Sequence, residues 1–300
     1  MRFAVYSGCT VLGRARNYEM ASRAVARAMG IEFIDIDRFE CCGFPLKSVN
    51  HEAFMMTAAA NIFAAEMCDV DICTLCSACT SSLTEVNKYM EENFNAKARM
   101  ISTLRRQCVE YRMGRSIRVK HFVKILHEDI GIEHIRTLVK RDLAGLRFAA
   151  HYGCHYLRPA EIYANAEDPE HPFSLDELIR VTGAETIDYE QKLRCCGAGV
   201  LAISEELAYS IARPKLRELS AQKADAIVLM CPFCSVMFDD NQRKIEQKFD
   251  EEYNMPVLYY PQVLGLALGI DERSLGLRMN RVPTRDLLQR IPEGEGENGK

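Results

Sequence analysis

Cys195-Cys196-Gly197 is a pair of adjacent cysteines followed by glycine, and the same triplet occurs earlier at Cys41-Cys42-Gly43. A lone cysteine precedes each triplet, and a C-x-x-C pair follows it. Ten of the thirteen cysteines therefore fall into two sets of five. The first set is Cys9, Cys41, Cys42, Cys76 and Cys79, and the second set is Cys154, Cys195, Cys196, Cys231 and Cys234. The shared order, at a nearly constant offset, indicates an internal duplication.

The composition is that of a globular protein. Of the 300 residues, 48% are apolar, which is enough for a real core, and 27% are charged. The net charge of −4, without a basic block, argues against nucleic acid as a partner. No apolar run reaches the roughly 18–20 residues that span a bilayer, and the start lacks the features of a signal peptide. We therefore expect a cytoplasmic protein without a membrane span, with reduced cysteines that serve metal binding or redox chemistry.

Strand-like and helical segments alternate along the chain, and their order restarts near residue 146. The expected strands are residues 3–7, 31–36, 70–75, 117–122, 146–152, 185–189, 226–230 and 257–259. Such alternation predicts parallel sheets covered by helices on both faces. The expected fold is therefore α/β, with two pseudo-symmetric Rossmann-like halves that each carry a CCG motif.

The duplication also sets the expected domain boundaries. We place an N-terminal CCG domain at residues 1–143, a C-terminal CCG domain at 144–281 and a flexible tail at 282–300. A helix at residues 174–182 is expected to begin with Ser174 as its N-cap and Glu177 in a capping box.

The cysteines are expected to gather at one edge of each sheet, because ligands of open α/β sheets bind beyond the carboxyl ends of the strands. Four of them directly follow expected strands: Cys9, Cys76, Cys154 and Cys231. Four glycines beside the cysteines would give the backbone freedom next to a bulky ligand: Gly8, Gly43, Gly153 and Gly197.

Thiolate-only sites favour zinc or iron–sulfur clusters. Two adjacent cysteines do not comfortably bind one tetrahedral zinc ion together with the others, whereas they can bind two metal atoms of a cluster. Five thiolates also exceed the four that an ordinary cubane cluster takes. The sequence therefore favours one multi-iron cluster of unusual geometry in each half. Zinc in at least one half, disulfides and plain core thiols stay open as alternatives.

Three cysteines have no counterpart in the other half. Cys73 forms a second C-x-x-C pattern with Cys76 and could compete for metal binding. Cys68 and Cys108 lie in expected helices and are predicted to be buried structural thiols. His155, directly after Cys154, is the candidate catalytic residue as a proton donor, and His151 is either a second donor or a packed core histidine.

Two further patterns carry less information. Four basic residues near the cysteine loops could meet an anionic substrate, although a solvated surface role is expected for each: Arg14, Arg16, Lys47 and Arg158. Residues 197–202 fit the G-x-G-x-x-A dinucleotide pattern, but no buried strand is expected before them. We therefore expect neither flavin nor nicotinamide in this chain.

The cysteine pattern resembles the cysteine-rich CCG domain family and, within it, the B subunits of heterodisulfide reductases. The resemblance runs from Phe3 to about Leu277. It rests on seven runs, namely residues 8–9 (GC), 42–45 (CGFP), 119–122 (VKHF), 151–155 (HYGCH), 195–199 (CCGAG), 231–234 (CPFC) and 262–269 (QVLGLALG).

The resemblance implies that each set of five cysteines binds a non-cubane [4Fe-4S] cluster, with the substrate disulfide between the two clusters. Electrons would arrive from the iron–sulfur C subunit of heterodisulfide reductase, which the flavin-containing A subunit would feed. The reaction would be reduction of the coenzyme M–coenzyme B heterodisulfide in methanogenesis.

Two alternatives stay open beside this interpretation. The chain could be a related CCG-domain redox subunit that acts on another disulfide, or one that relays electrons in a non-methanogen respiratory or lactate/glycolate-type complex. A zinc-bound assembly protein without a redox role is an alternative of a different class.

Overall fold

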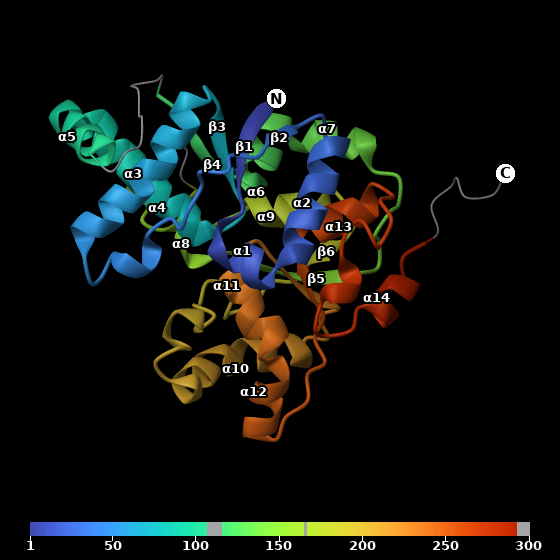
Figure 1. Ribbon diagram of the computed structural model, residues 1–300. Helices are drawn as coiled ribbons and strands as arrows, with labels where there is room; N and C mark the ends of the chain where they lie inside the picture. The colour runs from blue at the N-terminus through green and yellow to red at the C-terminus, as the bar shows by residue number, and fades with distance from the viewer. Residues whose placement is uncertain (107–115, 165–166, 293–300) are drawn as a thin grey trace.

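The computed structural model describes residues 1–106, 116–164 and 167–292, and within them the chain forms two parallel four-stranded sheets (Figure 1). The first sheet has the order β2-β1-β3-β4 and the second the order β6-β5-β7-β8. The strands are β1 (Arg2–Tyr6), β2 (Glu32–Ile34), β3 (Asp71–Thr74), β4 (Val119–His121), β5 (Arg147–His151), β6 (Glu185–Thr186), β7 (Ala226–Leu229) and β8 (Val257–Tyr259). The two identical strand orders confirm the predicted α/β fold with two Rossmann-like halves.

The register of the two sheets is also repeated. In the first sheet Val5 pairs with Cys73, and in the second Ala150 pairs with Val228. Every residue of the central strands β3 and β7 is buried, as expected for parallel strands covered on both faces. In each sheet the second strand of the chain lies on one side of the first strand, and the third strand lies on the other side. The carboxyl ends of β1 and β3, and those of β5 and β7, therefore flank a topological switch point.

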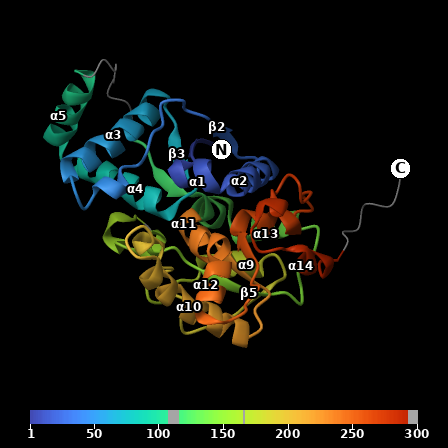
Figure 2. The ribbon, with the colours of Figure 1, turned by 60° about the horizontal axis from the view of Figure 1, so that its bottom comes forward.

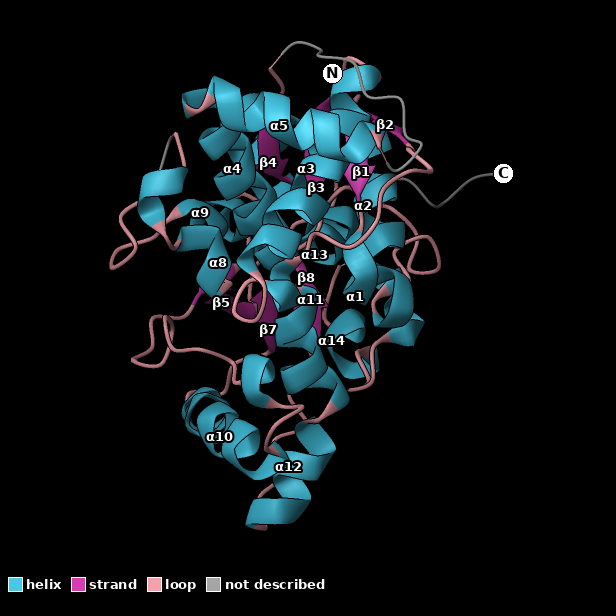
Figure 3. Ribbon diagram, turned by 60° about the vertical axis from the view of Figure 1, so that its left-hand side comes forward, coloured by secondary structure: helices cyan, strands magenta, loops and turns pink. Residues whose placement is uncertain are grey.

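Helices connect the strands of each half and cover its sheet. Those of the first half are α1 (Gly8–Arg14), α2 (Arg16–Ala28), α3 (His51–Met67), α4 (Ser77–Glu92), α5 (Phe94–Arg105), α6 (Phe122–Lys124) and α7 (Ile132–Leu138). Those of the second half are α8 (Cys154–Leu157), α9 (Ser174–Arg180), α10 (Glu205–Ala221), α11 (Pro232–Ser235), α12 (Gln242–Phe249), α13 (Tyr260–Ala267) and α14 (Arg285–Gln289). Figure 3 shows the strands enclosed by helices in both halves.

Equivalent helices begin with equivalent caps. The Asn50 side chain accepts a hydrogen bond from Ala53 N at the start of α3, and the Ser204 side chain accepts one from Leu207 N at the start of α10. These two caps are 154 residues apart, as are the first cysteines of the two triplets. The duplication therefore extends from the cysteines to the helices that follow them.

The two halves pack against each other through helices. α13 of the second half lies along α2 of the first, which Figure 2 shows from below, and α8 contacts α4. Tyr18 of α2 stacks on Tyr259, with ring centroids 4.1 Å apart and an interplanar angle of 6°. Buried apolar residues of both halves form one continuous cluster, so the halves share a core.

The structure differs from two local predictions, the start of α9 and the flexible tail. Ser174 is the first helical residue of α9 rather than its N-cap, because its hydroxyl donates to Glu167 Oε2 and does not cap the helix; the capping-box prediction is therefore wrong. Residues 282–292 do not form a flexible tail, since they carry α14 and bury Val282 and Leu287. Residues 293–300 lie outside the described part of the chain. The boundary between residues 143 and 144 stays a prediction.

Candidate metal centres

The sheet edges bring the lone cysteines and the C-x-x-C pairs together. Cys9 and Cys154 lie at the starts of α1 and α8, three residues after β1 and β5 end. Cys76 and Cys231 are the N-cap residues of α4 and α11, both with extended backbone. Unsatisfied amides at a helix start favour a thiolate over a thiol. The predicted placement beyond the carboxyl ends of the strands is therefore observed.

Each triplet turns sharply at its glycine. Gly43 has φ +79° and Gly197 has φ +86°, in the left-handed region that favours glycine. A Cβ atom at Gly43 would lie 3.1 Å from Phe54 O in α3, and one at Gly197 would lie 2.7 Å from Ala208 O in α10. The glycine therefore lets each pair of adjacent cysteines sit directly against a helix.

The first set of cysteines converges on one place. All five of its cysteines line a small apolar cavity, together with Phe233 from the second half. Hydrogen bonds from the neighbouring thiols of Cys41 and Cys79 lower the pKa of Cys42 to about 3. The pKa of Cys41 is raised, first because its thiol shares a proton with Cys42. Of the two triplet cysteines, the more buried Cys42 is therefore the one that favours the thiolate form.

The second set forms the same kind of array. Contacts with the thiols of Cys154 and Cys196 lower the pKa of Cys195 to about 2, and Gly197 N donates to Cys195 Sγ at 3.4 Å. The thiol of Cys196 in turn contacts that of Cys234, and Cys234 contacts Cys231. All five thiols of the second set are thereby linked through direct contacts.

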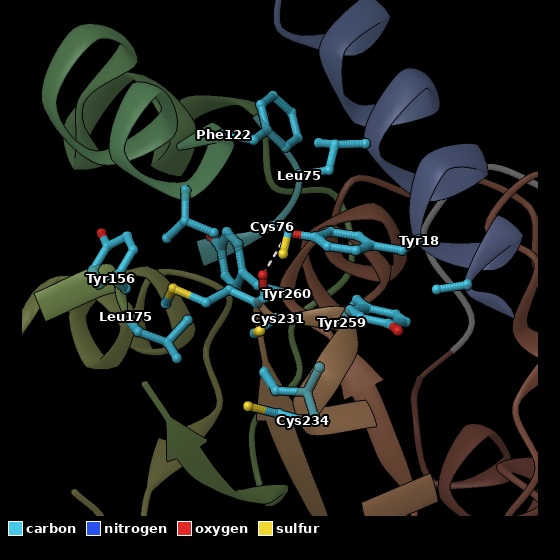
Figure 4. Close-up of a cluster of buried hydrophobic side chains, with 14 of the residues drawn as sticks. Tyr18, Leu75, Cys76, Phe122, Tyr156, Leu175, Cys231, Cys234, Tyr259 and Tyr260 are labelled. Carbon is cyan, nitrogen blue, oxygen red and sulfur yellow. Dashed lines mark hydrogen bonds between the residues drawn. The ribbon is translucent and has the colours of Figure 1, made fainter. Parts of the chain in front are cut away.

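The two sets meet between the halves. The thiols of Cys76 and Cys231 contact each other, and this contact favours thiolate at Cys231 and thiol at Cys76. Figure 4 shows these two residues between the tyrosines of the shared core. Beside them the Met230 carbonyl accepts a hydrogen bond from Tyr18 Oη at 2.9 Å and lies 3.1 Å from His121 Nε2. We call this meeting point of Cys76, Cys231 and Met230 the seam.

His155 lies at the edge of the seam. Its ring packs edge-on against Phe44, which directly follows the first triplet, with ring centroids 4.8 Å apart. Burial lowers the pKa of His155, and thiols of both sets act on it electrostatically, Cys231 and Cys195 from one and Cys42 from the other. The structure therefore places this predicted residue between the two sets, whereas His151 is fully buried on β5.

The chemistry of the donor set fits a cluster better than a single ion. Within the described residues, no three His, Cys, Asp or Glu side chains are arranged to hold one metal ion. The twelve cysteines there are free rather than in disulfides. Five thiols around one cavity suit a ligand with several metal atoms, each bound by one or two of them.

The unmatched cysteines stand apart from both arrays. Cys73 is buried within β3, and burial alone raises the pKa of its thiol. It does not line the cavity of the first set, so the structure does not support competition with Cys79 for metal. Cys68 is exposed at the end of α3, and its predicted burial is wrong. Cys108 lies outside the described residues.

The basic residues near the cysteine loops are mostly on the surface. Arg14, Arg16 and Arg158 are exposed, and Arg158 pairs with Glu170. Lys47 is half-buried and pairs with Glu85 at 2.5 Å, and its charge acts on His155. Of the four, only Lys47 is linked to the seam.

Lys215 belongs to the surroundings of the second set, although sequence reasoning does not identify it. This residue of α10 is 1% exposed, and its amine lies 2.7 Å from His151 Nδ1 and donates to the carbonyls of Lys192 and Arg194 at 3.1 and 3.0 Å. Burial lowers the pKa of Lys215 to about 8, while the thiols of the second set oppose this effect. A lysine in an amphipathic helix is ordinarily solvated, so no sequence signal marks it.

Comparison with known proteins decides the family. The cysteine-rich CCG domain matches twice, at residues 3–84 and 148–239, and the two matches contain every cysteine of both sets. Over 97% of its length the chain is 32% identical to the B subunit of the ferredoxin/F420H2-dependent CoB-CoM heterodisulfide reductase of Methanosarcina acetivorans, 97% of which is covered. The chain belongs to the CCG family of heterodisulfide reductase B subunits. Members of this family are oxidoreductases, and the chain is an iron–sulfur redox subunit of an enzyme with several different chains.

Other relatives extend the family. The B subunit of the ferredoxin:CoB-CoM heterodisulfide reductase of Methanosarcina mazei is 33% identical, with 97% of each chain covered. The 8-methylmenaquinol:fumarate reductase membrane anchor subunit of Wolinella succinogenes is 29% identical, with 95% of this chain and 98% of that one covered. A hypothetical protein from Helicobacter pylori shares the fold, with a TM-score of 0.73 at 13% identity, over 94% of this chain and 52% of the other. Among the described helices, none is both long and apolar enough to cross a membrane.

Proposed function

We propose that this chain is the catalytic subunit that reduces a disulfide to two thiols, and that its substrate is the coenzyme M–coenzyme B heterodisulfide. The observation that carries the proposal is the meeting of two five-thiol sets at Cys76 and Cys231. The names of the relatives in two Methanosarcina species support the choice of substrate.

In this proposal each set of cysteines holds one non-cubane [4Fe-4S] cluster. The first would be held by Cys9, Cys41, Cys42, Cys76 and Cys79, and the second by Cys154, Cys195, Cys196, Cys231 and Cys234. Two such clusters would supply the two electrons that the reaction needs, one from each. Two electrons and two protons convert the disulfide into two thiols, so the reaction balances without a protein dithiol.

The chain's own residues would orient the reaction at the seam. Such a site must exclude water and still admit a substrate, and the cysteines meet both requirements. Cys42, Cys76, Cys196 and Cys231 are buried, which excludes water, whereas Cys9 and Cys195 are exposed and leave each set open on one side. A disulfide bound between the sets would therefore have one set of cysteines on each of its two sides.

His155 is proposed to donate a hydrogen bond to a departing thiolate. Its lowered pKa keeps the imidazole neutral, and a neutral imidazole still carries one N–H group. The edge contact with Phe44 holds the ring between the two halves. A hydrogen bond to a sulfur that gains negative charge is stronger than one to the neutral disulfide, so it favours cleavage.

The proposed partners follow from the same family. An iron–sulfur C subunit would deliver electrons, and a flavin-containing A subunit would feed it, in a cytoplasmic complex. The chain itself is proposed to hold neither flavin nor nicotinamide. The loop at residues 197–202 is already occupied by the second triplet and the 3-10 helix Ala198–Val200 that follows it.

Turnover with a chemical electron donor tests the proposal. The anaerobically purified protein, with its clusters intact, is expected to release both thiols from the coenzyme M–coenzyme B disulfide, at a rate that exceeds the rate with cystine or glutathione disulfide. If the intact protein cleaves another disulfide and leaves this one untouched, the assigned substrate is wrong.

A second candidate function has its own support. The Wolinella succinogenes relative is named as a subunit of a menaquinol:fumarate reductase, although it matches this chain over nearly its whole length at 29% identity. The chain could accordingly relay electrons to a partner in a respiratory or lactate/glycolate-type complex, or act on another disulfide. Reduction of the clusters by a quinol-linked partner, with no turnover of any disulfide, would favour this second function.

A further inference from the structure

Lys215 places a cation beside the second set of cysteines. Its amine is held by three acceptors, His151 Nδ1 at 2.7 Å and the carbonyls of Lys192 and Arg194 at 3.1 and 3.0 Å. The residue is 1% exposed, so water contributes little to its solvation. The amine is therefore fixed in position directly behind the second triplet, whose first cysteine follows Arg194.

The charge of this amine has no carboxylate to balance it. Among the residues that the structure describes, no Asp or Glu forms an ion pair with Lys215, and its other neighbours are the rings of Tyr189 and Phe238, at 5.7 and 5.8 Å from the amine to the ring centroids. A buried charge is costly unless an opposite charge lies nearby. The thiols of Cys234, Cys196, Cys154 and Cys195 are the groups of the second set that act on it electrostatically.

The first half has no such cation at the equivalent place. Asn61 of α3 precedes Lys215 by 154 residues, the same offset that separates the triplets. Its side chain donates to Cys41 O at 3.1 Å and accepts from Glu40 N at 2.8 Å, so it occupies the corresponding position behind the first triplet. Tyr6, 145 residues before His151, donates its hydroxyl to Glu40 O. Neutral Asn61 and Tyr6 thus stand where the second half has Lys215 and His151.

We propose that Lys215, held by His151, is a positioning residue that makes the two clusters unequal, so that the second cluster has the higher reduction potential. This inference rests on the proposed function, because it assumes a cluster in each set. A fixed positive charge stabilises the reduced, more negative state of a nearby cluster more than the oxidised state. An electron shared between the two clusters would therefore reside on the second one.

Three variants separate the charge of Lys215 from its shape. Lys215→Met removes the charge at similar length, Lys215→Gln removes it but keeps a hydrogen-bond donor, and Lys215→Arg keeps it. Lys223→Met is the matched control, because it removes the same charge from an exposed residue just beyond the end of α10. The measurement is potentiometric titration of the anaerobic full-length protein, followed by electron paramagnetic resonance and iron content.

Both neutral variants are expected to disfavour reduction of one cluster at least tenfold, which corresponds to about 59 mV for one electron, and to leave the other cluster unchanged. Lys215→Arg and Lys223→Met should keep both potentials. Loss of one cluster in both neutral variants, with retention in Lys215→Arg, would also support a requirement for the charge. Two unchanged potentials, equal shifts of both clusters, or loss of a cluster in Lys215→Arg as well would overturn the inference. A parent protein that holds no iron would instead refute the proposed function.

Discussion

Cys196 shows what a single residue does in these sites. It is buried, and its thiol contacts those of Cys195 and Cys234, so it joins the triplet to the C-x-x-C pair. It is the middle member of the series of thiol contacts that runs from Cys154 through Cys195, Cys196 and Cys234 to Cys231. Its removal should therefore open the array at its centre.

The Cys196→Ser variant is expected to lose about half of the iron, falling from roughly eight to roughly four atoms per chain, together with disulfide reduction. The measurement is iron content by mass spectrometry on anaerobic protein. Cys68→Ser is the matched control, because Cys68 is exposed and belongs to neither set. Full iron content in Cys196→Ser would contradict the assignment of this ligand.

The His155→Phe variant should keep its clusters but react slowly. Phenylalanine preserves the edge contact with Phe44 and removes the N–H donor. We expect a fall in kcat on the order of 10²-fold, with unchanged iron content and little change in KM, in steady-state assays with a chemical electron donor. Wild-type kcat in this variant would exclude the proposed hydrogen bond to the departing thiolate.

For single residues, the sequence predicts the two sets of cysteines well and the side chains around them poorly. The two sets can be read from spacing, because a duplicated pattern repeats both order and offset. Lys215 cannot, since its burial depends on how α10 packs against His151 and the loop at Arg194. The exposure of Cys68 has no sequence signal either, because this residue lies just past the last turn of α3, where the side chain turns outward.

The elements that hold the cysteines depend on two glycines with left-handed backbone. Gly43 and Gly197 each end a triplet and are the N-cap residues of a short 3-10 helix. The second of them lies closer to its neighbouring helix, since an added Cβ atom would approach the Ala208 carbonyl to 2.7 Å. Displacing a backbone carbonyl within a helix costs free energy.

Gly197→Ala is therefore expected to lower the free energy of unfolding by at least about 2 kcal/mol, through left-handed strain of about 1–2 kcal/mol and the added contact. Gly199→Ala is the control two residues away, because a Cβ atom there would meet nothing within 4 Å. Urea unfolding of both variants provides the comparison. Equal stability of the two would show that α10 yields to the extra atom.

Most strands and helices follow from the alternation of apolar segments, and all eight predicted strands are found, although several are shorter than expected. Errors arise where tertiary contacts override local signals. The Ser174 hydroxyl turns to Glu167 instead of capping α9. Val282 stays buried because Asp239, near the end of the π-helix Val236–Asp240, accepts hydrogen bonds from Arg281 N and Val282 N.

For the whole molecule, the decisive feature is the seam between the halves. His121 belongs to the first half, and its Nδ1 accepts a hydrogen bond from Val123 N, which leaves the proton on Nε2 to face the Met230 carbonyl of the second half. Burial lowers the pKa of His121 to about 4. The neutral ring is therefore the form that joins the halves.

This predicts a pH dependence with a definite sign. Between about pH 6.5 and pH 4 the unfolded chain binds a proton at His121 and the folded chain does not, so the free energy of unfolding falls as the pH falls. The loss amounts to roughly 3 kcal/mol when complete, at 1.36 kcal/mol per pKa unit. Thermal unfolding from pH 7.5 to pH 5 should show a weaker dependence in His121→Gln than in the wild type. The same dependence in both would contradict this role, and His134→Gln, at an exposed histidine, should behave as the wild type.

Iron content tests the central claim most directly, namely that each half holds one multi-iron cluster in its five thiols. For anaerobically purified full-length protein we expect about eight iron atoms and a matching amount of acid-labile sulfide per chain. One or two zinc ions per chain, without iron or sulfide, would contradict it.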